Sequence, residues 1–81
     1  MKYLQFKFVA QSEDGRTYAR TMFYEQSTAP NEAQAIAHAG HNNPGFNDIR
    51  VASVTAISDD EYAFRIRVMC DSDTWGFQPV S

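Results

Sequence analysis

The side chains of this sequence that could support catalysis or metal binding are two histidines, a run of acids and one cysteine. His38 and His41 are three residues apart and could share a metal ion, but no further ligands are evident. Asp59-Asp60-Glu61 could attract a cation, although adjacent acids in a hairpin turn are more often a solvated tip. We therefore expect surface or capping roles for the histidines and no metal site.

Cys70 is the only cysteine, so no disulfide can form within the chain. A lone cysteine in an apolar strand is usually a small core residue, and the absence of nearby activating partners favours that role over a reactive thiol. The sequence has no nucleotide-binding loop, no paired-cysteine zinc spacing and no serine flanked by glycines. We therefore expect no cofactor and no enzymatic activity.

The composition predicts one globular domain, residues 1–81, with 43% hydrophobic and 14% aromatic residues. No stretch approaches the roughly 18 apolar residues of a membrane span, and the first residues alternate polar and apolar side chains rather than forming a signal peptide. Together with the single cysteine, these features indicate a cytoplasmic protein without a membrane partner. The net charge of −3 excludes neither a protein nor a nucleic acid as partner.

Residues 2–26 predict a β-hairpin, because residues 2–11 alternate and Asp14-Gly15 suits a two-residue type I′ turn. With that loop, Phe6 faces Phe23 across the ladder. The side then predicted to be buried carries Leu4, Phe6, Phe8, Ala10, Ala19, Thr21 and Phe23. The opposite side carries Tyr3, Gln5, Lys7, Val9, Tyr18, Arg20, Met22 and Tyr24.

A short helix of about ten residues is predicted next. Its entrance, residues 27–32, offers polar N-cap candidates, a proline for the first turn and Glu32 near the positive end of the dipole. Gly40 or the following Asn42-Asn43-Pro44-Gly45 would end it.

Residues 48–58 and 61–71 alternate as well and predict a second hairpin across Asp59-Asp60. Ile57 would face Tyr62, and Val51 would face Val68, on the buried side. The opposite side would carry Arg50, Ala52, Val54, Arg65, Arg67 and Met69. Asp59-Asp60 is a less favourable turn than Asp14-Gly15 and fixes the register less firmly. A slip by one residue would turn Arg65 and Arg67 inward.

The predicted fold is therefore α+β, with a four-stranded antiparallel sheet of two hairpins and one short helix packed on one face, in the order β-β-α-β-β. Trp75 and Phe77 in the tail are expected to fold back across a sheet edge or the helix, since aromatic side chains need apolar cover.

Five of the seven basic residues fall on the predicted sheet face turned away from the helix, whereas the acids fall on turns, strand ends and the tail. One explanation is an ordinary solvated face. Tyrosine, methionine and arginine are enriched in interfaces, however, and favour a contact surface or a homodimer surface. The predicted partner-binding residues are Tyr3, Lys7, Tyr18, Arg20, Tyr24, Arg50, Arg65, Arg67 and Met69.

The order strand, strand, helix (residues 31–37), strand, strand in a very short chain with a late Trp75 resembles some small phage-encoded anti-CRISPR proteins. The resemblance covers nearly the whole chain and is one of topology and size. It implies an inhibitor that binds a CRISPR surveillance complex, a nucleoprotein of the host cell cytoplasm, and blocks recognition of target DNA. The resemblance does not assign a partner-contacting role to any particular residue of this sequence.

Three hypotheses for the function follow. The first is an anti-CRISPR-like antagonist of a host protein or nucleoprotein complex. The second is a single-stranded nucleic-acid-binding domain whose tyrosines stack on bases and whose basic residues bind phosphates. The third is a homodimeric structural module. We prefer the antagonist, because it accommodates an acidic protein with one adhesive face and no catalytic motif.

Overall fold

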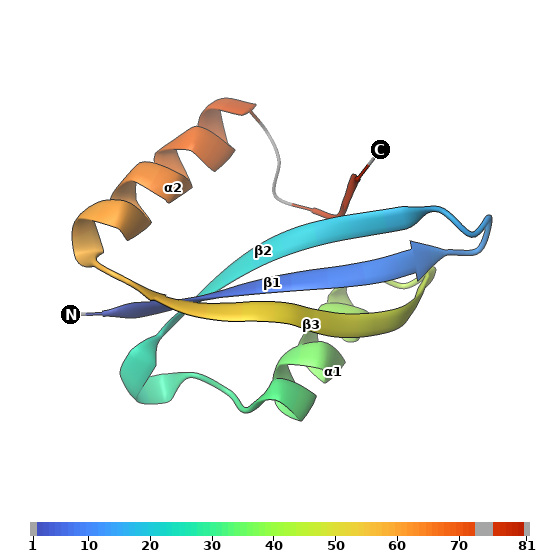
Figure 1. The fold of residues 1–81 in the computed structure, drawn as a ribbon, viewed down its shortest axis with the longest axis horizontal. Helices are drawn as coiled ribbons and strands as arrows, with labels where there is room; N and C mark the ends of the chain where they lie inside the picture. The colour runs from blue at the N-terminus through green and yellow to red at the C-terminus, as the bar shows by residue number, and fades with distance from the viewer. Residues whose placement is uncertain (1, 73–75, 81) are drawn as a thin grey trace.

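β1 (Tyr3–Ser12) is the central strand of the fold, because it pairs with β2 (Thr17–Glu25) on one side and β3 (Phe46–Ile57) on the other. The computed structural model describes residues 2–72 and 76–80 of the chain. Its four-stranded antiparallel sheet has the order β3-β1-β2-β4, with the short β4 (Gln78–Pro79) beside the start of β2 (Figure 1). The prediction of a small α+β domain with a four-stranded antiparallel sheet is confirmed.

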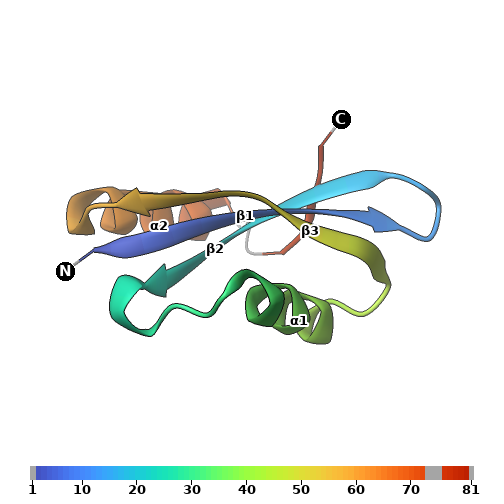
Figure 2. The same ribbon diagram turned by 60° about the horizontal axis from the view of Figure 1, so that its bottom comes forward.

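The core lies between this sheet and α1 (Glu32–Asn42), which covers one face of the sheet (Figure 2). Phe6, Phe8 and Ala10 of β1 pack against Ala35 and Ala39 of α1, and Phe8 is completely buried. Alanines on the buried face of α1 let the helix approach the sheet closely. Burying these aromatic rings supplies much of the hydrophobic stabilisation of so small a domain.

The predicted helix is confirmed, and its ends have clear local causes. Asn31 and Gln34 form a capping box, in which the Asn31 side chain accepts from the Gln34 backbone N–H at 2.8 Å and the Gln34 side chain accepts from the Asn31 N–H at 3.0 Å. At the other end the Asn43 side chain donates to the Ala39 carbonyl at 2.8 Å. A short 3-10 helix, η1 (Gln26–Thr28), connects β2 to this entrance.

The first hairpin forms, but its predicted register is wrong by one residue. The loop has three residues, Glu13, Asp14 and Gly15, and the Ser12 N–H donates to the Arg16 carbonyl at 3.0 Å. Only Gly15 has a positive φ, 83°, so the turn is of type I followed by a left-handed glycine rather than type I′.

This register exchanges the two faces of β2. Its even-numbered residues lie on the same side as Phe6 and Phe8, because Met22 is the partner of Phe6 and Tyr24 the partner of Leu4. Its odd-numbered residues lie on the face opposite α1. The residues placed on the wrong face of β2 are Tyr18, Ala19, Arg20, Thr21, Met22, Phe23 and Tyr24.

The predicted second hairpin is wrong, because the segment after β3 is a helix, α2 (Asp59–Ser72). Ser58 caps this helix, with its hydroxyl oxygen accepting from the Glu61 N–H at 3.2 Å and its carbonyl accepting from the Tyr62 N–H at 2.9 Å. Three acids in the first turn favour the helix further through the macrodipole. Arg65, Arg67 and Met69 therefore lie on a helix rather than on the sheet.

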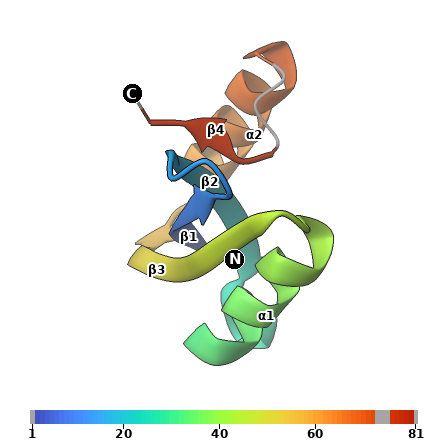
Figure 3. The same cartoon turned by 90° about the vertical axis from the view of Figure 1, so that its right-hand side faces the viewer.

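α2 is loosely attached to the rest of the molecule. Figure 3 shows α1 next to β3 and α2 on the far side of β2, away from α1. Tyr62 anchors α2 at its first turn by stacking on Tyr3 with ring centroids 3.7 Å apart and by meeting Phe23 edge-on at 5.5 Å. None of the described residues of α2 is buried, and Phe64 is 62% exposed.

The tail folds back against the sheet, and the expectation that Phe77 finds apolar cover there is confirmed. This ring is 9% exposed and stacks on Phe46 with centroids 4.7 Å apart, and the residues after it pair with β2 at Tyr18 and Ala19. Trp75 lies outside the described residues.

Candidate binding cleft between β2 and α2

Beyond β4, the outer edge of β2 is unpaired among the described residues. The Gln26 N–H donates to the Lys2 carbonyl at 3.0 Å, so the even-numbered residues of β2 bond to β1 and the odd-numbered ones direct their backbone groups outward. β4 pairs with Ala19, whereas Thr21 and Phe23 have no partner strand in the described part of the chain. Among the described residues, nothing pairs with their outward N–H and C=O groups, which could bond to a further strand.

One face of α2 forms a wall beside this edge. Tyr62, Ile66 and Met69 are spaced as neighbours on one side of a helix, and they line a depression of about 240 Å³ together with residues of β2. The residues that β2 contributes are Arg20, Thr21, Met22 and Phe23.

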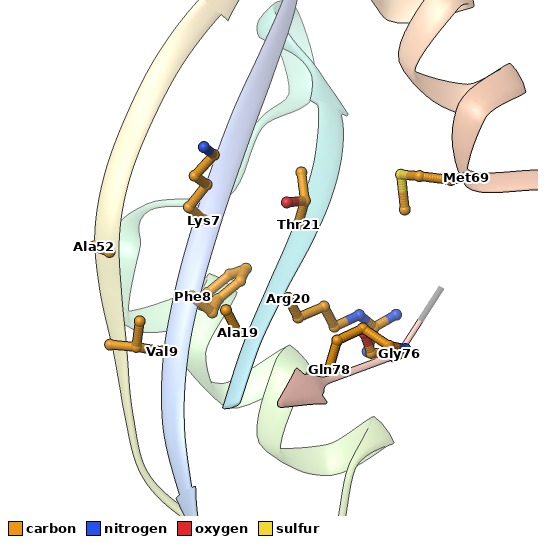
Figure 4. Close-up of a pocket in the computed structure, with 10 residues that line it drawn as sticks. All are labelled: Lys7, Phe8, Val9, Ala19, Arg20, Thr21, Ala52, Met69, Gly76 and Gln78. Atoms are coloured by element: carbon orange, nitrogen blue, oxygen red, sulfur yellow. The ribbon is translucent and has the colours of Figure 1, made fainter. Parts of the chain in front are cut away.

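A second depression of about 360 Å³ adjoins the first and extends both over the sheet, to β1 and Ala52 of β3, and toward β4. The two adjoin, because they share Arg20, Thr21 and Met69, and together we call them the β2–α2 cleft. In Figure 4, Met69 points from α2 toward β2, and Arg20 extends toward Gly76 and Gln78 at the far end. The lining of the cleft is mainly apolar and includes the basic side chains of Lys7 and Arg20.

The charged side chains that line the cleft, Lys7 and Arg20, are both basic. Within the described residues neither forms an ion pair, and the Arg20 Nε atom is buried without a hydrogen-bond partner. Burial raises the pKa of the nearby Tyr24 hydroxyl, and the positive charge of Arg20 acts in the opposite direction. A buried donor without an acceptor is costly, so the cleft favours a ligand that brings an acceptor or a negative charge.

Of the predicted partner-binding residues, the structure brings Lys7, Arg20 and Met69 together in this cleft. Tyr3 does not line the cleft but stacks on Tyr62, which does. Burial and the neighbouring Tyr62, Glu25 and Asp59 raise the pKa of Tyr3.

The other predicted contact residues lie elsewhere. Tyr18 and Tyr24 belong to the α1 side, where Tyr18 meets Phe46 edge-on at 5.0 Å and the Tyr24 hydroxyl lies 3.0 Å from Nδ1 of His38. Three arginines lie outside the cleft. These are Arg50, paired with Asp48 at 3.0 Å, Arg65, paired with Glu61 at 3.0 Å, and the exposed Arg67.

Sequence reasoning misses Thr21, Phe23, Tyr62 and Ile66 as cleft residues, because the alternating pattern places each of them on a buried strand face. One local signal could have found the α2 residues. Ser58-Asp59-Asp60-Glu61 has the spacing of a capping box, and it precedes apolar residues at helical spacing.

No protein-family model, curated protein or solved structure matches this chain. The described residues include no group of three or more histidine, cysteine or acidic side chains placed to hold a metal ion. No described helix is both long and apolar enough to cross a bilayer. The function must therefore be inferred from the cleft itself.

Proposed function

We propose that this protein acts by binding, without catalysis, and that the β2–α2 cleft holds an extended segment of a partner protein. The observation that carries this proposal is the pair of outward-facing residues, Thr21 and Phe23, beside the apolar face of α2. A segment that pairs with these residues adds a strand to the sheet. Its backbone N–H and C=O groups would then bond to those of Thr21 and Phe23.

The lining of the cleft defines the chemistry of that segment. Alternate side chains of an added strand point to the same side, so every second one would meet the wall of Tyr62, Ile66 and Met69. These positions favour apolar side chains. The basic side chains of Lys7 and Arg20 favour an acidic side chain in the segment, which would also give the buried Arg20 Nε an acceptor.

Peptides from a random library displayed on phage are the probe for this proposal. We expect the selected peptides to combine alternating apolar residues with an acid, and we expect Thr21→Pro to weaken their affinity about tenfold, the effect of losing one backbone hydrogen bond. The Thr21 N–H faces away from β1, so this substitution leaves the β1–β2 ladder intact. Affinity is measured by fluorescence anisotropy, with circular dichroism as the check of folding.

Two control variants make this test specific. Thr21→Val keeps the outward N–H and should bind like the wild type. Arg67→Glu changes an exposed arginine outside the cleft and should also have little effect, whereas Arg20→Gln should weaken the peptides that carry an acid. Equal affinity of Thr21→Pro and wild type would contradict strand addition in the cleft.

For the partner itself we propose the class that the resemblance to anti-CRISPR proteins implies, a host nucleoprotein complex whose recognition of target DNA is blocked. The segment in the cleft would belong to a protein subunit of that complex. Support comes from the small α+β fold and from a cleft suited to a protein segment. Co-purification with a panel of CRISPR effector complexes tests this class, with Thr21→Pro as the control variant, and binding to no member of the panel would contradict it.

The alternative of single-stranded nucleic-acid binding requires several aromatic side chains on one exposed surface, on which successive bases can stack. Tyr18 and Tyr24 pack on the α1 side and Tyr3 stacks on Tyr62, so the three tyrosines do not share an open face. No observation of the site favours this alternative. Filter binding at low and moderate salt tests it, because phosphate contacts weaken steeply with salt.

A further inference from the structure

Within residues 2–72 and 76–80, the outer edge of β3 also has no partner strand. β3 is the terminal strand in the order β3-β1-β2-β4, and all residues from Ala52 to Ala56 are exposed. Natural proteins commonly protect such edges with charged residues or proline. The regular part of this edge, Ser53–Ile57, contains no charged residue, proline or glycine.

The register identifies which backbone groups of this edge are open. Tyr3, Gln5 and Lys7 of β1 direct their backbone groups toward β3, since the even-numbered residues of β1 bond to β2. Their partners Ile57, Thr55 and Ser53 therefore bond to β1. Val54 and Ala56, which lie between these partners, direct N–H and C=O outward.

These two outward residues flank Thr55 symmetrically, so the edge is complementary to itself. In an antiparallel pair of two β3 strands with a two-fold axis at Thr55, Val54 of each copy lies opposite Ala56 of the other. Both N–H and both C=O groups of each such pair are then satisfied. The two Thr55 side chains lie directly opposite each other, and Thr–Thr is a favourable cross-strand pair.

The charges beyond this stretch are complementary under the same symmetry. Arg50 and Asp60 lie five residues on either side of Thr55, so the two-fold axis brings Arg50 of each copy toward the acidic first turn of α2 in the other. Arg50 pairs with Asp48 through Nε alone in the monomer, and its terminal nitrogens are available to a second acid. Opposite charges at both ends favour this register over a shifted one.

We propose that the outer edge of β3 binds a second copy of this chain, forming an antiparallel β3–β3 homodimer whose two-fold axis passes at Thr55. The dimer extends the sheet across two molecules. It goes beyond the peptide-binding proposal and uses the opposite edge of the sheet, because β1 separates β3 from β2. Variants of the cleft such as Thr21→Pro should therefore dimerise like the wild type.

The mass in solution, from light scattering over a range of micromolar concentrations, is the first test. We expect a species of twice the 9.2 kDa chain. Thr55→Lys places two like charges at the axis and should weaken dimerisation at least about tenfold, and Thr55→Glu should do the same. Mixing the two variants should restore a dimer, because lysine then faces glutamate. Thr55 is exposed, so both variants should fold, which circular dichroism verifies.

Disulfide trapping tests the position of the axis. In a background of Cys70→Ser, Thr55→Cys should form a covalent dimer under mild oxidation, because residues at a non-hydrogen-bonded antiparallel pair lie close enough for a disulfide. Ser53→Cys is the matched control, since it faces Ile57 of the other copy and should remain uncrosslinked. A wild-type monomer at all concentrations, a dimer that persists in Thr55→Lys, or equal crosslinking of both cysteine variants would overturn the proposal.

Discussion

At the scale of single residues, the turn after β1 determines which side chains of β2 are buried. Asp14 orders this turn by accepting hydrogen bonds from the Ser12 hydroxyl and from the Arg16 N–H, the latter at 3.1 Å. Gly15 then takes the left-handed conformation, with φ 83°, which costs glycine nothing and other residues about 1 kcal/mol or more. These local interactions select a three-residue loop.

The Asp14 carboxylate should make the hairpin sensitive to acid. Its hydrogen bond from Ser12, followed by that from the Arg16 backbone, lowers the pKa of Asp14 below the usual range. A lowered folded-state pKa gives a stabilising contribution that is present above the unfolded-state pKa and lost as the pH falls through the folded-state pKa. NMR titration of the carboxyl carbon should show the lowered pKa.

The matched variants for this titration are Ser12→Ala and Asp14→Asn. Ser12→Ala removes the largest contribution and should move the pKa of Asp14 back toward its usual range. Asp14→Asn should abolish the contribution of this group to the acid dependence of unfolding. An unchanged pKa of Asp14 in Ser12→Ala would show that the hydroxyl does not set it.

At the scale of elements, α2 combines a strand-like sequence with a helical structure. Tyr62, Phe64, Ile66 and Val68 alternate with other residues, a pattern typical of a strand, yet the capping by Ser58 and the acidic first turn favour a helix. Alternating apolar residues on a helix point to more than one side. This is why Tyr62 and Ile66 line the cleft whereas Phe64 and Val68 remain exposed, at 62% and 45%.

We expect α2 to open locally before the sheet does, because none of its described residues is buried and Tyr62 supplies its aromatic contacts. Hydrogen exchange should show faster exchange in α2 than in β1 and α1. Tyr62→Ala should speed exchange in α2 without changing the other elements. The control is Phe64→Ala, and a similar acceleration in both variants would contradict the anchoring role of Tyr62.

At the scale of the whole molecule, the core is one-sided. α1 covers one face of the sheet, and Phe77 from the end of the chain completes that core by stacking on Phe46. α2 lies beyond the β2 edge and leaves a cleft instead of a second packed layer. Stability therefore resides on one side of the sheet, and both proposed interactions use its open edges.

Phe77→Ala should destabilise the whole domain by roughly 3 kcal/mol, the usual cost of removing a buried aromatic ring. This is a large fraction of the total stability of a domain of this size. Urea unfolding followed by circular dichroism measures the change. Val80→Ala, at a side chain that is 59% exposed, is the control, and equal effects of the two substitutions would show that the tail does not belong to the core.

Much of this fold follows from local sequence patterns. Alternation in residues 2–11 indicated β1 and its buried side, and the polar entrance and the final glycine and asparagines indicated α1. These features depend on neighbours within a few residues, so the sequence alone specifies them. The same reasoning placed Lys7 and Arg20 among the contact residues. It assigned them to the sheet face opposite the helix, whereas in the structure they line the β2–α2 cleft.

The sequence by itself determined the α+β class, the first strand with Phe6 and Phe8 on its buried side, and the helix that covers it. The tertiary structure decided the register of β2, the helical state of residues 59–72 and therefore the cleft between them. The physical reason is that an alternating pattern divides a strand into two faces but does not indicate which face is buried, because a slip of the register by one residue exchanges them. In the first hairpin the loop geometry at Gly15 decides this, and after β3 the cap at Ser58 turns an alternating segment into a helix.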